Sequence, residues 1–119
     1  MIEVVITSYK EPETVGKAIE AFLDQDLEEE YRIWVVAPDE ETLGVAYEYV
    51  ARDERVRVYK DHGKGKFYAL HQIFPILEGE IVVISDGDVF VKKDSLKYLI
   101  EPFGDRRVGC VAGRPVSVE

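Results

Sequence analysis

The sequence of 119 residues contains no asparagine and only one cysteine, Cys110. A lone cysteine excludes a disulfide within the chain, which fits a reducing compartment. The first residues lack the basic start and the small-residue cleavage site of a signal peptide, so we expect a cytoplasmic protein. No apolar run approaches the ~18 residues that a membrane-spanning helix needs, so no membrane segment is expected. The missing asparagine, together with abundant glutamate and lysine, favours a thermophilic source.

Acidic residues clearly outnumber basic ones. The chain has 15 Lys and Arg against 24 Asp and Glu, a net charge of −9. Nucleic acids and anionic membrane surfaces both reward clustered basic residues, so this balance argues against either as the main partner. A small anionic ligand remains compatible with it, because such a ligand needs only local positive charge or a metal ion.

Apolar, largely β-branched segments alternate along the chain with segments of helical periodicity. Strands are predicted at residues 2–7, 31–37, 55–59, 81–84 and 107–113. Apolar residues at helical spacing predict four helices between them, with inward faces at Val15, Ile19, Phe22 and Leu23; Leu43, Ala46, Tyr47 and Val50; Phe67, Leu70, Phe74 and Leu77; and Leu96, Leu99, Ile100 and Phe103. Pro75 should end the third helix early. This order predicts one α/β domain, a Rossmann-like three-layer α/β/α sandwich with a mainly parallel sheet.

The most informative stretch is the acidic turn Ser85-Asp86-Gly87-Asp88. It follows residues 81–84, which we expect to form a strand buried on both faces of the sheet. Ligands of open α/β sheets bind at the carboxyl ends of the strands. Two neighbouring carboxylates repel each other unless a cation or a wet turn accommodates them. A divalent metal holding a diphosphate would explain the pair, and a solvated Asp-Gly turn is the alternative.

Other polar residues follow strands at the same predicted edge. Tyr9 and Glu11 come after the first strand, and Asp39 comes after the second. The convergence of these polar groups with Asp86 and Asp88 is what a nucleotide site needs. A basic, glycine-containing loop at residues 60–66 leads into the third helix.

Four of these motifs, in this order, resemble the nucleotide-binding half of family-two glycosyltransferases, which have the GT-A fold. Tyr9-Lys10-Glu11 is similar to the family's Tyr-Asn-Glu loop, with Lys10 in place of Asn. The family's Asp-Asp-Gly-Ser turn is absent, and Asp39 takes its place. The segments Gly63-Lys64-Gly65-Lys66 and Ala69-Leu70-His71 are similar to a Gly-Lys segment and an Ala-Leu-Asn helix. Asp86 and Asp88 match the Asp-x-Asp motif.

The resemblance implies a site for a nucleoside diphosphate sugar, lined by Tyr9 and Glu11. In that family the base is most often uracil, so a UDP-sugar is expected, with Asp39 accepting a hydrogen bond from the base. Asp86 would hold the ribose or a metal-bound water, and Asp86 with Asp88 would form the site of Mg²⁺ or Mn²⁺. Lys66, with Lys64 as the alternative, would add positive charge near the phosphates.

The resemblance also implies what this chain does not carry. Members of the family continue past a segment similar to Gly113-Arg114, and the later portion holds the acceptor site and the catalytic base. Residues 1–119 are therefore expected to form a single donor-binding domain, and no catalytic residue is assigned. The chain would serve hexosyl transfer to an unknown acceptor. The alternatives are a non-catalytic nucleotide or nucleotide-sugar module, or the donor-binding subunit of a split transferase. An uncovered strand edge around residues 108–111 predicts a homodimer.

Overall fold

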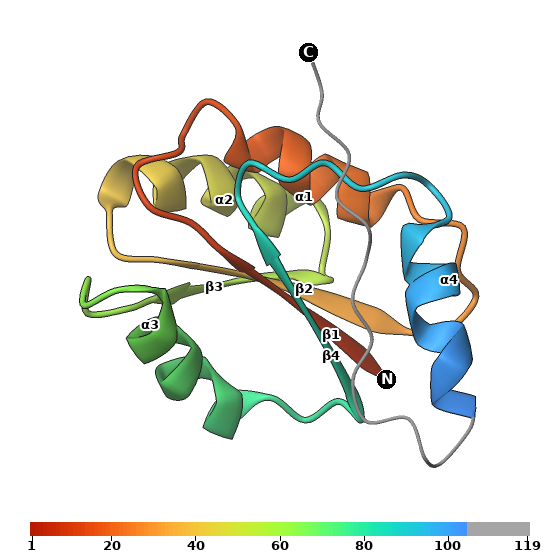
Figure 1. Ribbon diagram of the computed structural model, residues 1–119. Coiled ribbons are helices and arrows are strands. Elements are labelled where there is room, and N and C mark those ends of the chain that lie inside the picture. The colour runs from red at the N-terminus through yellow and green to blue at the C-terminus, as the bar shows by residue number, and fades with distance from the viewer. Residues whose placement is uncertain (105–119) are drawn as a thin grey trace.

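The computed structural model describes residues 1–104, which contain a sheet of four parallel strands (Figure 1). The strands are β1 (Ile2–Thr7), β2 (Tyr31–Ala37), β3 (Val56–Lys60) and β4 (Ile81–Asp86), in the order β3-β2-β1-β4. The first two predicted strands are confirmed at both ends. The predicted strand at 107–113, and with it the homodimer edge at 108–111, lies outside the described residues, so the homodimer stays a prediction.

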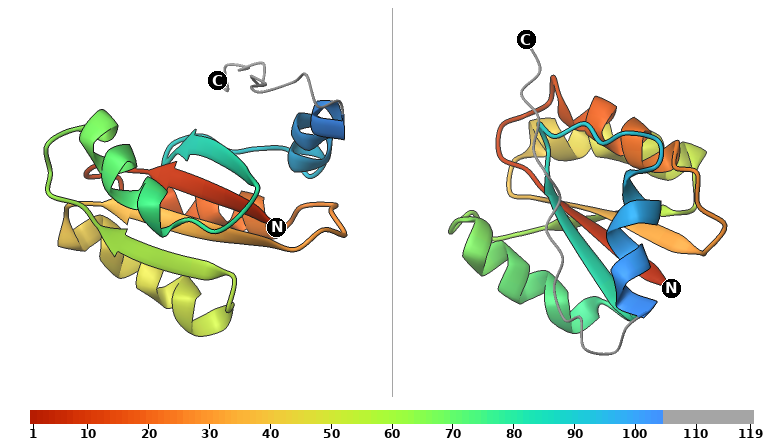
Figure 2. Two further views of the ribbon diagram at one scale, coloured as in Figure 1. Left: turned by 90° about the horizontal axis from the view of Figure 1, so that it is seen from below. Right: turned by 45° about the vertical axis from the view of Figure 1, so that its right-hand side comes forward.

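Helices cover both faces of the sheet (Figure 2). Helices α1 (Val15–Leu23) and α2 (Glu40–Arg52) lie on one face, and α3 (Lys66–Ile73) lies on the other. The helix α4 (Ser95–Ile100) packs Leu96 into the core on the side of α1. The short 3₁₀ turns η1 (Phe74–Ile76) and η2 (Glu101–Gly104) complete the described chain. The predicted three-layer α/β/α sandwich is confirmed. No helix within residues 1–104 is both long and apolar enough to cross a membrane.

Alternation along the central strands divides the core into two clusters. Ile2, Val4 and Ile6 of β1 face α1 and α2, where Phe22 is also fully buried. Val5 faces the opposite way and belongs to the cluster under α3. Successive side chains of a strand point to opposite faces, and β1 is buried throughout its length, including the polar Glu3 and Thr7.

The inward faces of two helices differ from the prediction. The buried residues of α3 are Ala69 and Ile73, whereas Phe67 and Phe74 are 77% and 44% exposed. In α2, the predicted Tyr47 and Val50 are likewise exposed, while Thr42, Leu43 and Ala46 are buried. The small Ala69 allows α3 to lie close to the sheet. A prediction from the spacing of large apolar side chains does not take such a small residue into account. The predicted effect of Pro75 is confirmed, because α3 ends at Ile73 and Pro75 lies in η1.

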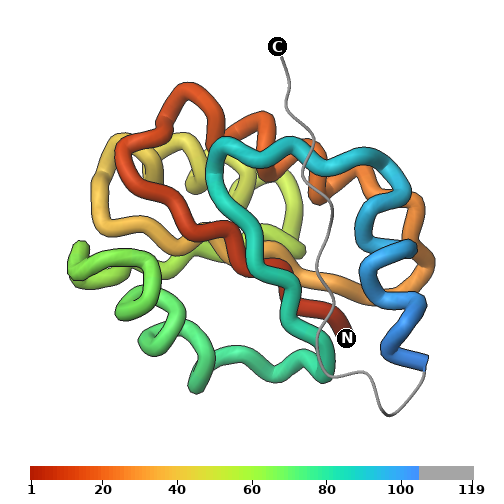
Figure 3. Tube along the Cα trace, in the orientation of Figure 1, coloured from red at the N-terminus to blue at the C-terminus, as the bar shows by residue number. Residues whose placement is uncertain are grey.

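Strand β4 also differs from the prediction. Val82 and Ile84 are 39% and 45% exposed, so within the described part of the chain β4 is not buried on both faces. In that part it pairs only with β1, along which it runs in register (Figure 3). Its alternating pattern of half-buried and exposed residues is that of a strand with one face covered.

The order of the strands creates a topological switch point between β1 and β4. The chain leaves β1 through α1 toward β2, and it leaves β3 through α3 to reach the opposite side of β1. In open α/β sheets, ligands bind in the crevice outside the carboxyl ends of the strands at such a point. Thr7 and Asp86, the last residues of β1 and β4, are register partners there.

Candidate functional site

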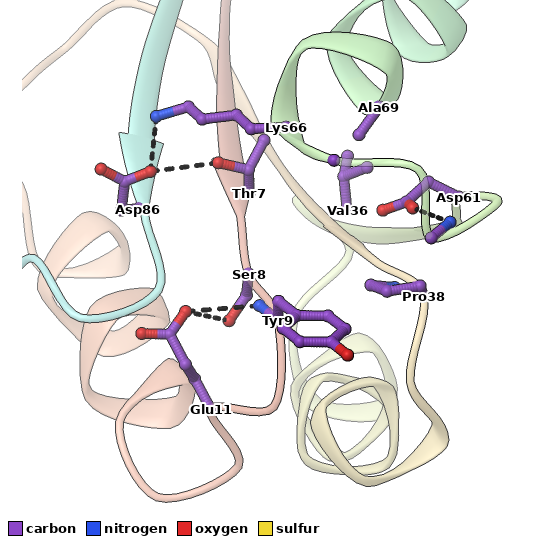
Figure 4. A pocket seen from close by; sticks show the side chains of 12 residues that line it. Thr7, Ser8, Tyr9, Glu11, Val36, Pro38, Asp61, Lys66, Ala69 and Asp86 are labelled. Carbon is purple, nitrogen blue, oxygen red and sulfur yellow. Dashed lines mark hydrogen bonds and ion pairs between the residues drawn. The ribbon is translucent and has the colours of Figure 1, made fainter.

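A cavity of about 420 Å³ lies at this carboxyl edge of the sheet (Figure 4). Its wall is formed by the ends of β1, β2 and β4, by the loops that follow β1, β2 and β3, and by the start of α3. The lining residues are Thr7, Ser8, Tyr9, Glu11, Val36, Pro38, Asp61, Gly63, Gly65, Lys66, Ala69 and Asp86. Of the predicted site residues, Tyr9, Glu11, Lys66 and Asp86 are thus brought together, whereas Asp39 and Asp88 do not line the cavity.

Asp86 is the centre of the polar wall. Its Oδ1 accepts hydrogen bonds from Thr7 Oγ1 at 3.1 Å and from Lys66 Nζ at 2.6 Å. The side chains of Lys66 and Asp86 are about half exposed, at 50% and 46%. Gly65, with φ +100°, adopts a conformation that favours glycine and places Lys66 at the first position of α3. A cation, a carboxylate and a helix N-terminus, which attracts anions, therefore meet at one point.

The loop after β1 is held by its own hydrogen bonds. Ser8 Oγ donates to Glu11 Oε1 at 2.8 Å, and the Tyr9 N–H donates to the same oxygen at 3.4 Å. The Glu11 N–H donates to Thr42 Oγ1 at 3.0 Å, which ties the loop to the first turn of α2. Tyr9 remains 61% exposed and lines the cavity. The loop is thus fixed while an aromatic face stays available to a ligand.

Asp39 is the N-cap of α2. Its Oδ2 accepts from the Thr42 N–H at 3.1 Å and from Thr42 Oγ1 at 2.6 Å, and its Oδ1 accepts from the Lys10 N–H at 3.0 Å. Burial raises the pKa of the Asp39 carboxyl, but the hydrogen bonds from Thr42 and Lys10 outweigh it and hold that pKa below its ordinary value. Both oxygens are committed to fixing α2 and the Lys10 loop.

Asp88 lies two residues beyond the end of β4 and is exposed. The intervening Gly87 packs so closely on the loop after β1 that a Cβ there would lie 2.2 Å from Ser8 Oγ, so only glycine fits. Within residues 1–104, no three His, Cys, Asp or Glu side chains form a group that could hold a metal ion. A metal at this turn would therefore take one or two carboxylates and complete its shell with ligand oxygens, as Mg²⁺ commonly does.

Asp61 is a cavity residue that the sequence analysis missed. Its side chain follows the end of β3 and is only 6% exposed. Its Oδ1 accepts from the Gly63 N–H at 2.7 Å, and its own N–H donates to the Ala37 carbonyl at 3.1 Å. The signal was available, because Asp61 comes two residues after the predicted strand at 55–59, and the carboxyl ends of parallel strands meet at one edge of the sheet. Instead, only the basic residues of this loop were predicted to be ligand-binding candidates.

Residues 3–119 match the family model described as Glycosyl transferase family 2. The chain belongs to this family. Two curated relatives, both described as beta-monoglucosyldiacylglycerol synthase, come from Trichormus variabilis and a Nostoc species. Each is 27% identical over 90 residues, which cover 71% of this chain and 19% of the relative. The family 2 chain therefore spans about a fifth of the length of these curated relatives.

Solved structures share the fold of this chain. The mannosyltransferase PcManGT from Pyrobaculum calidifontis, in complex with GDP-Man and Mn²⁺, superposes with a TM-score of 0.83 at 22% identity, over 91% of this chain and 33% of that one. TarS 1-349 from S. aureus, in complex with UDP, gives a TM-score of 0.64 at 25% identity, over 86% of this chain and 32% of that one. The predicted family resemblance and the GT-A fold are confirmed.

Proposed function

We propose that this family 2 chain binds a nucleoside diphosphate sugar in the cavity between β1 and β4, as the donor-binding part of a glycosyltransferase. One observation carries the proposal. Lys66, Thr7 and Asp86 converge at the topological switch point, beside the turn that holds Asp88. The complexes of PcManGT with GDP-Man and of TarS with UDP support a donor of this class.

The charges around Asp86 fit a diphosphate and a cation better than either alone. The Lys66 ammonium bonds to Asp86, and a diphosphate would provide Lys66 with a second anionic partner. Asp86 and Asp88 would hold Mg²⁺ or Mn²⁺ together with phosphate oxygens. When bound, such an ion acts as a Lewis acid and neutralises the leaving diphosphate. Tyr9 would contact the nucleoside, and Glu11 would keep the Tyr9 loop in place through Ser8.

Titration calorimetry with GDP and UDP, each with and without Mn²⁺, tests this proposal. We expect the wild type to bind at least one of the two in a manner that requires Mn²⁺. Asp88→Asn should weaken that binding by about tenfold or more, because even outer-shell partners of a metal typically cost that much when they are lost.

Asp94→Asn is the matched control, since Asp94 is exposed and its side chain makes no capping hydrogen bond to α4. It should bind as the wild type does. If neither nucleotide binds in the presence of Mn²⁺, or if Asp94→Asn loses as much affinity as Asp88→Asn, the proposal is wrong.

A further inference from the structure

We infer that Asp61 reads the base of the bound nucleotide and selects guanine over uracil. This inference rests on the proposed nucleotide site and assigns its base specificity. It places base reading at Asp61 rather than Asp39, and it favours a GDP-sugar over the UDP-sugar expected from the resemblance. This inference is supported by the geometry of the cavity, the hydrogen bonds that Asp39 and Asp61 already accept, and the hydrogen-bonding groups of the two bases.

The cavity has two chemically different sides. Asp86, Thr7 and Lys66 form the charged side, where a diphosphate fits. Apolar surface from Val36, Pro38 and Ala69, together with the Tyr9 ring, lines the rest of the cavity around Asp61. Figure 4 shows this group facing Asp86 and Lys66 from across the cavity. Flat apolar surface beside one buried polar group suits an aromatic base, which stacks on its faces and hydrogen-bonds through its edge.

Asp61 is the buried carboxylate on that apolar side. Asp61 is only 6% exposed. Within residues 1–104 its carboxylate accepts one hydrogen bond, from the Gly63 N–H to Oδ1. In Figure 4 the other oxygen points away from the Gly63 loop, toward the side on which Val36 lies. This oxygen is open to the cavity rather than sealed from it, because within residues 1–104 the fully buried side-chain oxygen without a partner is Thr14 Oγ1. It can therefore accept a hydrogen bond from a ligand that presents N–H groups.

Asp39 has no equivalent capacity. Its two oxygens already accept three hydrogen bonds, from Lys10 and Thr42, and Pro38 rather than Asp39 lines the cavity. To read a base, Asp39 would have to release the N-cap of α2. Asp61 needs no such rearrangement, since its bond to Gly63 uses one oxygen and leaves the other open to the cavity.

The hydrogen-bonding edges of guanine and uracil determine which of these bases a carboxylate at Asp61 favours. An ionised carboxylate can only accept hydrogen bonds. Guanine presents two adjacent donors, N1–H and the N2 amino group, which match the acceptors of a carboxylate. Uracil presents one donor, N3–H, between two carbonyl oxygens, and these oxygens repel the carboxylate. Asp61 should therefore favour guanine, and removal of the N2 amino group should weaken binding.

The test is calorimetry in the presence of Mn²⁺ with GDP, inosine diphosphate, xanthosine diphosphate and UDP. The wild type should bind GDP most tightly and inosine diphosphate, which lacks the N2 amino group, about tenfold or more weakly. Asp61→Asn keeps an acceptor for Gly63 and adds an N–H donor. Because xanthine carries a carbonyl where guanine carries the amino group, this variant should lose affinity for GDP and gain affinity for xanthosine diphosphate.

Asp24→Asn, an exposed residue at the C-terminal end of α1 outside the cavity, is the matched control and should keep the wild-type ranking. A wild type that binds UDP as tightly as GDP, or an Asp61→Asn variant with an unchanged ranking of the bases, would overturn this inference and leave the proposed donor site standing. If none of the nucleotides binds, the proposed function fails as well.

Discussion

At the scale of single residues, Lys10 is the strained position of the donor loop. Its φ of +51° is the one positive value among non-glycine residues of the described chain. The left-handed region costs an L-residue roughly 1–2 kcal/mol, and asparagine tolerates it better than lysine does. Asparagine, which the family's Tyr-Asn-Glu motif has at this position, therefore suits this backbone conformation better than Lys10 does.

Lys10→Asn should therefore raise the free energy of unfolding, by about 0.5–1 kcal/mol. Urea denaturation of both proteins measures the change. The loop should keep its conformation, because the bond between the Lys10 N–H and Asp39 uses the backbone rather than the side chain.

Lys17→Asn provides the opposite control. Lys17 is exposed within α1, where the backbone is right-handed and asparagine is a poorer helix former than lysine. This substitution should lower the stability slightly. A Lys10→Asn variant that is destabilised to the same degree would show that the positive φ is not relieved by asparagine.

At the scale of elements, α2 depends on the carboxylate that the resemblance assigned to the base. Asp39 caps α2, and its loss should cost about 1–2 kcal/mol in Asp39→Ala, measured by chemical denaturation. Asp39→Asn should retain most of that stability, since asparagine caps helices nearly as well. It should also retain nucleotide affinity, because Asp39 does not line the cavity. A large loss of affinity without loss of stability in Asp39→Asn would restore Asp39 as the base-reading residue.

Elements were predictable from the sequence where one local pattern decides them. β1 and β2 are apolar runs bounded by turn residues, and their predicted bounds agree with the structure. The predicted inward face of α3 was wrong because the short helix packs on the sheet through the small Ala69, which leaves Phe67 exposed. Periodicity of large side chains cannot express such close approach.

The site was predictable to the same degree. The rule that ligands bind at the carboxyl ends of strands predicted one edge with Tyr9, Glu11, Asp39, Asp86 and Asp88, and the resemblance added Lys66. The structure places Tyr9, Glu11, Asp86 and Lys66 around one cavity. The rule does not say which carboxylate at that edge faces the cavity. That depends on the hydrogen bonds that occupy Asp39 and leave Asp61 with capacity, and these are tertiary contacts between separate loops.

At the scale of the whole molecule, Glu3 links three segments that are distant in the sequence. This fully buried residue of β1 accepts hydrogen bonds from Trp34 Nε1 of β2 and from the N–H groups of Glu78 and Gly79, which precede β4. Arg32 Nη1 lies 3.9 Å from its carboxylate. Burial raises the pKa of Glu3, but the hydrogen bonds from Trp34 and the two backbone groups outweigh it, and the pKa falls below its ordinary value of 4.5.

The lowered pKa makes Glu3 a source of pH-dependent stability. A group whose pKa is lower in the folded state contributes stability above its unfolded pKa and loses it as the pH falls through the folded value. The protein should therefore lose stability below a pH of about 4.5, where Glu3 becomes protonated in the unfolded chain.

Glu3→Gln should be less stable at pH 7 by about 1–3 kcal/mol, because a side-chain amide accepts through one oxygen only and leaves a buried N–H unpaired. It should also lose less stability on acidification than the wild type. Urea denaturation between pH 7 and pH 3 measures both effects, with the exposed Glu13→Gln as control. Equal acid dependence in Glu3→Gln and the wild type would mean that the acid sensitivity of the fold arises from other carboxylates, of which Asp39 and Asp53 also have lowered pKa values.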